Sequence, residues 1–133
     1  MPESEAVLFA NEAFYRAFAD RDLSAMEALW SEAAPVSCIH PGWAPLFGRD
    51  DVLRSWAAII GAPGAPDIAC RGARARIYGD TAFVVCFERL GDDYLIATNV
   101  FVREDRLWRM VHHQSGPTAG DPGPEDRAPP AMN

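Results

Sequence analysis

The stretch that decides the fold is residues 107–116, LWRMVHHQSG, which has the pattern of a final strand. Successive side chains of a strand point to opposite faces. His112 and His113 should therefore point in opposite directions, so only one imidazole can face the interior of a curved sheet. We expect this strand to form one wall of a pocket. The pattern also argues against a metal site held by both histidines.

The segments before this strand change from a helical period to a period of two. Apolar residues at helical spacing predict helices at about 5–19, 23–30 and 50–60, with a short strand at 35–40 and an aromatic loop at 41–48. From residue 66 onward, alternating segments separated by turn signals predict a meander of strands at about 66–78, 81–90, 94–103 and 107–115. This order predicts an α+β domain, in which three N-terminal helices cover the concave face of a curved antiparallel sheet. The space between these layers is the expected pocket.

Composition limits the classes of function. The 133 residues fit one domain, and the net charge of −7 disfavours nonspecific binding to nucleic acid or to an anionic membrane. All 12 basic residues are arginine, which excludes a Schiff-base lysine. No apolar run reaches the roughly 18 residues of a membrane helix, and the acidic start is unlike a signal peptide, so we expect a cytoplasmic protein. We expect the folded domain at 1–117 and a disordered tail, rich in Pro and Gly, at 118–133.

Three motifs together carry a resemblance to a known family. They are NEAFYRAF at 11–18 with the helix that follows, HPGW at 40–43 with the helix from 49, and WRMVHHQS at 108–115. In their order and spacing, over about residues 5–117, the chain resembles the SnoaL-like branch of the nuclear-transport-factor-2-like superfamily. The last motif is also similar to the association domain of calcium/calmodulin-dependent protein kinase II.

This resemblance implies a cone-shaped, cystatin-like α+β barrel that forms a homodimer through its convex sheet face. Members include polyketide cyclases, ketosteroid isomerase, dehydratases, ligand-binding proteins and assembly modules, so the fold alone does not select a function. Gln114 stands where relatives often have a third histidine. A role that needs a base at that position is therefore not implied for this chain.

The residues themselves suggest two catalytic centres. If 94–103 pairs with the last strand through the turn at 104–105, Asn99 lies on the same face as His112. A neutral imidazole beside an amide is suited to moving a proton at an enolisable carbon, and the alternative is a structural polar pair in an apolar core. Glu88 ends the apolar run at 83–88, where burial would raise the pKa of its carboxyl group. The alternative is that Glu88 meets solvent or Arg89.

Further side chains are candidates for contacts with a ligand. His40 precedes the Pro-Gly-Trp loop and either closes the pocket mouth or anchors the loop through a hydrogen bond. The complete set of ligand-binding candidates is Tyr15, Trp30, His40, Trp43, Phe47, Phe101, Met110 and Gln114. We expect neither a cofactor nor a metal, because the spacing does not bring His40, His112 and an acid together as zinc ligands.

Two classes of function remain open. The first is a cofactor-independent isomerase, cyclase or dehydratase that moves a proton on a small apolar carbonyl compound. The second is a noncatalytic module that binds a small molecule or assembles as a dimer. The polar wall of Asn99 and His112 favours the first class, and the absence of an obvious pair of pocket aspartates favours the second.

Overall fold

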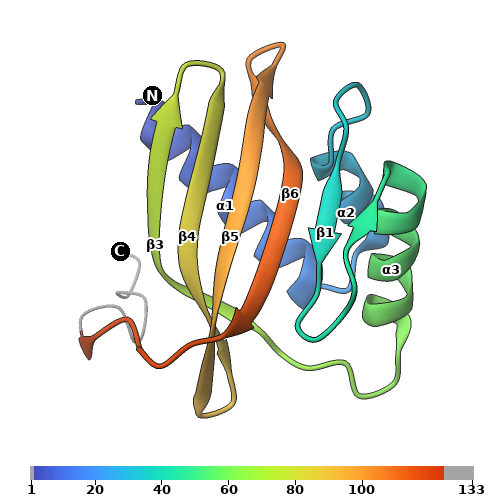
Figure 1. The fold of residues 1–133 in the computed structure, drawn as a ribbon, viewed down its shortest axis with the longest axis vertical. Coiled ribbons are helices and arrows are strands. Elements are labelled where there is room, and N and C mark those ends of the chain that lie inside the picture. Colours follow the sequence, from blue (N-terminus) through green and yellow to red (C-terminus); the bar gives the residue numbers. More distant parts are fainter. Residues whose placement is uncertain (1, 125–133) are drawn as a thin grey trace.

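A computed structural model describes residues 2–124 of the chain. Within this range, three helices lie against one six-stranded sheet (Figure 1). The helices are α1 (Glu3–Ala19), α2 (Leu23–Leu29) and α3 (Arg49–Gly61). The strands are β1 (Ser37–Ile39), β2 (Leu46–Phe47), β3 (Ala69–Tyr78), β4 (Thr81–Leu90), β5 (Asp93–Glu104) and β6 (Leu107–Pro117). The α+β class predicted from the sequence is confirmed.

The described chain ends shortly after β6. Residues 118–123 contain no helix or strand, and 125–133, which we expected to belong to a disordered tail, lie outside the described residues. None of the helices in residues 2–124 has the length and apolar character needed to cross a bilayer.

The sheet has the strand order β2-β1-β6-β5-β4-β3. Strands β3 to β6 form the expected antiparallel meander, whereas β1 runs parallel to β6 and antiparallel to β2. The sheet is therefore mixed, and its edge strands β2 and β3 do not pair with each other, so the barrel is open. Strand β2 lies in the segment that we expected to be only a loop.

The core lies between α1 and the sheet. Helix α1 crosses one face of the long strands (Figure 1), and its apolar residues recur at helical spacing, so one side of the helix is buried. Phe14 of α1 packs edge to face against Trp56 of α3, with ring centroids 5.3 Å apart. On β4 every second side chain, from Ala82 to Glu88, is buried against this layer. The helices thus cover one face of the sheet and leave the other face open.

A β-bulge interrupts the pairing of β5 with β6. Phe101 pairs with Met110, but the next residue of β5, Val100, pairs with His112. Val111 is therefore an extra residue in β6, and such a residue shifts all later side chains of its strand to the opposite face.

After the bulge, the side chains of β6 lie on the opposite face from the one that simple alternation predicts. Beyond Val111, His113 and Ser115 are buried on the helix-covered side, whereas His112 is half-buried and Gln114 is exposed. Asn99 accordingly pairs with His113. The prediction that Asn99 and His112 share a face is wrong, because the period of two does not continue through the bulge.

Candidate functional site

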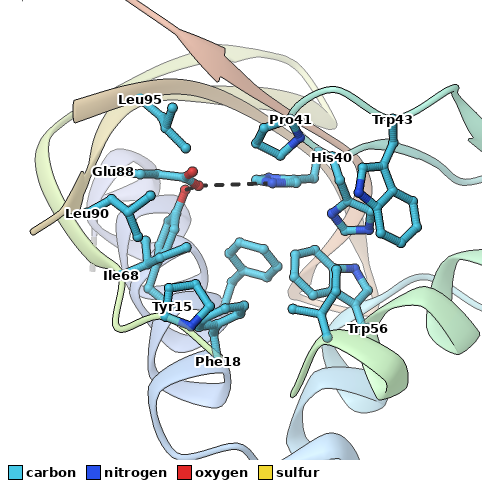
Figure 2. Close-up of a pocket in the computed structure, with 14 residues that line it drawn as sticks. Tyr15, Phe18, His40, Pro41, Trp43, Trp56, Ile68, Glu88, Leu90 and Leu95 are labelled. Atoms are coloured by element: carbon cyan, nitrogen blue, oxygen red, sulfur yellow. Dashed lines mark hydrogen bonds and ion pairs between the residues drawn. The ribbon is translucent and has the colours of Figure 1, made fainter. Parts of the chain in front are cut away.

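A cavity of about 300 Å³ lies between the helices and the concave face of the sheet. Its walls are mostly aromatic and aliphatic, and Figure 2 shows Glu88 and Tyr15 on one side, facing His40, Trp43 and Trp56 on the other. The lining side chains that can titrate are Tyr15, His40, Glu88 and His113, and the indole N–H groups of Trp43 and Trp56 add hydrogen-bond donors. The cavity is thus an apolar space with a few convergent polar groups, which is the usual composition of a small-molecule site.

Glu88 supplies the carboxyl group of the cavity. It stands on the inward face of β4, only 3% exposed. The Tyr15 hydroxyl donates to Oε2 over 2.6 Å, and the Ser115 hydroxyl donates to Oε1 over 2.5 Å. Burial raises the pKa of Glu88 above its usual value, although these two hydrogen bonds act in the opposite direction. The carboxylate is therefore a stronger base than an exposed glutamate, yet its lone pairs are partly satisfied.

His113 stands beside this carboxyl group. Its Nδ1 lies 2.5 Å from Oδ1 of Asn99, which can only accept, so Nδ1 carries the proton. Burial, together with the neighbouring His112, lowers the pKa of His113 to about 3, so the ring is neutral near pH 7. Its Nε2 is consequently an acceptor, and this atom lies 4.0 Å from Oε2 of Glu88.

Two asparagines fix the orientation of that imidazole. The Asn99 amide Nδ2 donates to Oδ1 of Asn11 over 2.8 Å and to the Tyr15 hydroxyl over 3.2 Å. Both donated bonds require the amide nitrogen to point toward α1, so the Asn99 oxygen points toward His113. The fully buried network therefore runs from α1 through β5 to β6, and it selects one tautomer of the histidine.

His40 forms the opposite wall. Its Nε2 lies 2.9 Å from Ser55 Oγ, and the Ser55 hydroxyl donates to the carbonyl oxygen of Val52 over 2.6 Å. Because that hydroxyl proton is used, His40 Nε2 must be the donor to Ser55. The ring packs between Trp43 and Trp56, with centroid distances of 4.7 and 4.6 Å. Burial lowers the pKa of His40 to about 4, and the imidazole of His113 is a second, smaller cause of this shift.

The arrangement is suited to proton transfer with a bound molecule. A carboxylate of raised basicity and an imidazole nitrogen with a free lone pair meet at one end of an apolar cavity, where a proton can move between them and a bound molecule. In the described part of the chain, no three His, Cys, Asp or Glu side chains converge as metal ligands.

Several of the residues singled out from the sequence line this cavity. They are Tyr15, His40, Trp43 and Glu88. Asn99 lies directly behind the wall, where it is fully buried and bonded to His113. The loop position of Trp43 leaves its ring 46% exposed at the cavity, whereas His40 both lines the cavity and anchors its surroundings through Ser55.

Three other predicted residues lie on the outer side of the molecule. His112 faces away from the cavity, and its Nδ1 lies 2.7 Å from the Ser37 hydroxyl of β1. Gln114 is exposed on the same side of β6 because of the bulge. Phe47 of β2 is 71% exposed and does not line the cavity. The structure thus separates these side chains from Glu88.

The remaining candidates belong to the core. Trp30, Phe101 and Met110 are almost completely buried, and none of them lines the cavity. Trp30 forms an isolated backbone bridge with Met110 directly after α2, so its backbone lies beside β6. Their apolar character is explained by packing rather than by ligand contact.

The sequence reasoning missed His113, Ser115, Trp56 and Asn11. His113 and Ser115 were assigned to the wrong face because no sequence signal marks the bulge. Asn11 did carry a signal, because it precedes Tyr15 by four residues and therefore lies on the same side of a helix. An amide within the apolar stripe of a helix indicates a buried polar partner.

Comparisons with known proteins identify the family of this domain and proteins of similar fold. Residues 7–119 match the family model of the SnoaL-like domain. A solved structure from Streptomyces avermitilis, described as a "putative dehydratase from the NTF2-like family", is 34% identical with a TM-score of 0.80, and the match covers 89% of this chain and 97% of that one. A "putative calcium/calmodulin-dependent protein kinase type II association domain" from Thiobacillus denitrificans is 36% identical with a TM-score of 0.73, covering 82% and 92%.

A curated plant protein is also similar. F-box protein SKIP8 of Arabidopsis thaliana is 34% identical over 115 residues, which are 84% of this chain and 49% of the plant protein. The chain therefore spans about half the length of this relative.

Proposed function

Because the chain belongs to the SnoaL-like domain family, we propose that it is a cofactor-independent enzyme that moves a proton on a small apolar carbonyl compound. The reaction classes that fit are isomerisation, cyclisation and dehydration. The observation that carries the proposal is the pair of Glu88 and His113, buried side by side at one end of an apolar cavity.

In this proposal Glu88 is the general base. Its carboxylate takes a proton from the carbon next to the substrate carbonyl, which leaves an enolate on the substrate and a neutral acid on Glu88. The protonated Glu88 then returns this proton to another atom of the bound molecule, while the His113 Nε2 lone pair, 4.0 Å away, accepts a hydrogen bond from that molecule. The raised pKa of Glu88 favours proton abstraction near neutral pH, which is the condition for efficient general-base catalysis.

The dehydratase class has additional support from one relative. The Streptomyces avermitilis protein, whose name describes it as a "putative dehydratase", is 34% identical over most of both chains. Removal of water from a hydroxy-carbonyl compound begins with the same abstraction of a proton beside the carbonyl. Glu88 is placed to carry out this abstraction.

The second candidate function is a noncatalytic dimeric module. The relative from Thiobacillus denitrificans is named as an association domain. The face of the sheet that the helices leave open also carries a row of partly exposed apolar side chains, namely Phe83, Val85, Phe87, Ile96, Val100 and Val102. We propose that two copies of the chain pack through this convex face, whether or not the cavity is catalytic.

The test of catalysis is the exchange of α-protons of 2-tetralone, a small enolisable ketone, in D2O. Proton NMR follows the loss of the α-CH signal for the wild-type protein and for Glu88→Gln, His113→Gln and His112→Gln. The last variant is a matched control, because His112 lies next to His113 in the chain but outside the cavity. We expect Glu88→Gln and His113→Gln to lose at least about a hundredfold in rate, since a general base contributes roughly 10² to 10⁴.

The outcomes separate the two functions. Exchange that depends on Glu88 and His113 but not on His112 supports the enzyme. Binding of the ketone, seen as a thermal shift, without exchange above the buffer rate would contradict proton transfer and favour the noncatalytic module. Equal loss of rate in all three variants would mean that the cavity geometry does not determine the chemistry.

A further inference from the structure

We infer that the cavity selects an uncharged compound of one or two rings that presents a hydroxyl group to Glu88 and His113, and that it rejects the carboxylate of the same skeleton. This inference rests on the proposed function, because it names the substrate class of the same site. It concerns binding alone, so that it can be tested without turnover.

Among residues 2–124, no permanently positive side chain lines the cavity. The chain contains no lysine, and none of the arginines in this range is part of the cavity wall. His40 and His113 are both buried, with pKa values lowered to about 4 and 3, so neither is a cation at neutral pH. An anionic ligand would therefore be desolvated beside Glu88 without a counter-charge, which is strongly unfavourable.

The protons of the polar side chains around Glu88 are already used in hydrogen bonds within the protein. The hydroxyl protons of Tyr15 and Ser115 are both donated to Glu88, and the Nδ1 proton of His113 is donated to Asn99. The polar atoms left at this end of the cavity are thus acceptors, namely the carboxylate oxygens of Glu88 and Nε2 of His113.

A ligand hydroxyl complements these acceptors. Oε2 of Glu88 and Nε2 of His113 are 4.0 Å apart, which is too far for a direct hydrogen bond. Oε2 of Glu88 already accepts from the Tyr15 hydroxyl, whereas Nε2 of His113 has no donor, so a ligand hydroxyl placed between them donates its proton to Nε2. An ether oxygen offers only lone pairs. The indole N–H of Trp56 is also buried without a hydrogen-bond partner, but Figure 2 places Trp56 on the side of the cavity opposite Glu88, so the free groups beside Glu88 remain acceptors.

The volume of the cavity also limits the size of the ligand. A volume of about 300 Å³ is at the lower end of the range for ligand pockets. The rings of Phe14, Phe18, Trp43 and Trp56 form flat apolar surfaces around it, which suit an aromatic or cyclic skeleton.

The test compares four ligands with one skeleton: naphthalene, 2-naphthol, 2-methoxynaphthalene and 2-naphthoate. Calorimetric titration of the wild-type protein at pH 7 gives their dissociation constants. We expect 2-naphthol to bind about tenfold tighter than the methyl ether, which is the size of one net hydrogen bond. We expect 2-naphthoate to bind at least about a hundredfold more weakly than 2-naphthol, because its charge has no partner.

A pair of variants locates the preference. His113→Phe should remove the advantage of 2-naphthol over its methyl ether while naphthalene still binds, and the matched control His112→Phe should keep the advantage. Binding of 2-naphthoate as tight as that of 2-naphthol would overturn the inference, and so would failure of all four ligands to bind. These outcomes need only the wild-type protein, so the inference stays testable even if His113→Phe does not fold.

The failure of this inference is distinct from failure of the proposed function. A wild-type protein that prefers 2-naphthol but shows no Glu88-dependent exchange of 2-tetralone would have the inferred ligand class without the catalysis. A protein that exchanges 2-tetralone but binds 2-naphthoate tightly would have the catalysis with a different ligand class.

Discussion

One extra residue in β6 decides which histidine of the pair meets the cavity. His112 and His113 are chemically identical and adjacent, yet the first contacts Ser37 on the outer side and the second lies 4.0 Å from Glu88. The difference follows from Val111, the residue of the bulge. Bulges are frequent next to active sites because they redirect a side chain, and here the redirected side chain is the imidazole that lies beside Glu88.

The buried imidazole makes the protein sensitive to acid. The pKa of His113 is about 3 when folded and 6.5 when unfolded, so the unfolded state binds more protons between these values. The contribution of neutral His113 to the free energy of unfolding is therefore complete above pH 6.5 and is lost as the pH falls toward 3. Between pH 6.5 and 4.5 we expect a loss on the order of 2 to 3 kcal/mol from this residue. Urea unfolding at several pH values measures it.

Variants separate His113 from the other titrating groups. The raised pKa of Glu88 acts in the opposite direction, since its contribution is complete below pH 4.5 and is lost as the pH rises. We therefore compare the free energy of unfolding of the wild-type protein with that of His113→Phe at each pH. The difference between the two values should become smaller as the pH falls. His112→Phe is the control, and an equal narrowing for both variants would refute the assignment.

The Tyr15 hydroxyl should tune the basicity of Glu88. Its hydrogen bond to Oε2, 2.6 Å long, favours the ionised carboxylate and lowers the pKa of Glu88. Tyr15→Phe should therefore raise this pKa further and move the acidic limb of the pH–rate profile for 2-tetralone exchange to higher pH. Tyr78→Phe provides a control, because Tyr78 is 64% exposed on β3. An unchanged profile in Tyr15→Phe would show that Glu88 is not the group whose ionisation limits the rate.

The two tryptophans of the cavity belong to different kinds of element. Trp56 of α3 is buried and touches rings from α1 and β6, whereas Trp43 lies in the loop between β1 and β2 with its ring half-exposed. We expect Trp56→Ala to lower the free energy of unfolding by about 3 to 5 kcal/mol, and Trp43→Ala by less than about 1 kcal/mol. Thermal unfolding measures both. A large loss of stability in Trp43→Ala would mean that the loop is part of the core.

The elements differ in how much of them the sequence could predict. The helices follow from apolar residues at helical spacing, and Gly79 and Gly91 mark turns between strands, where both adopt positive φ. The parallel pairing of β1 with β6 was not predicted, because a three-residue strand carries too few side chains to specify its partner. The bulge escaped detection for a related reason, since Val111 fits either face of an apolar strand.

The site was predicted in part for the same physical reasons. Glu88 and Tyr15 were named as candidates because each lies within or beside an apolar run, but the run at 81–90 is apolar on both faces, so it left open whether Glu88 meets the cavity or solvent. Assignment of the paired histidine required the register of β6, and a shift by one residue exchanges every face of a strand. Contacts such as that of His40 with Ser55 join distant elements, and only the tertiary structure can establish them.

At the scale of the whole molecule, the helices cover one face of the sheet and leave an apolar face open. We expect a homodimer formed through this convex face, since burial of partly exposed valine and phenylalanine side chains favours association. Light scattering measures the mass in solution. Val100→Arg on β5 should give a monomer, and Phe9→Arg, at a 71% exposed position of α1, should leave the dimer intact. A wild-type monomer would contradict the proposed assembly.

We propose that Glu88 acts as a base of raised pKa in a buried apolar cavity. An NMR titration of its side-chain carboxyl carbon, labelled with ¹³C in the wild-type protein and assigned by its loss in Glu88→Gln, tests this proposal. We expect a titration midpoint above 4.5 that rises further when 2-methoxynaphthalene excludes water from the cavity. A midpoint at or below 4.5 that does not respond to the ligand would contradict it.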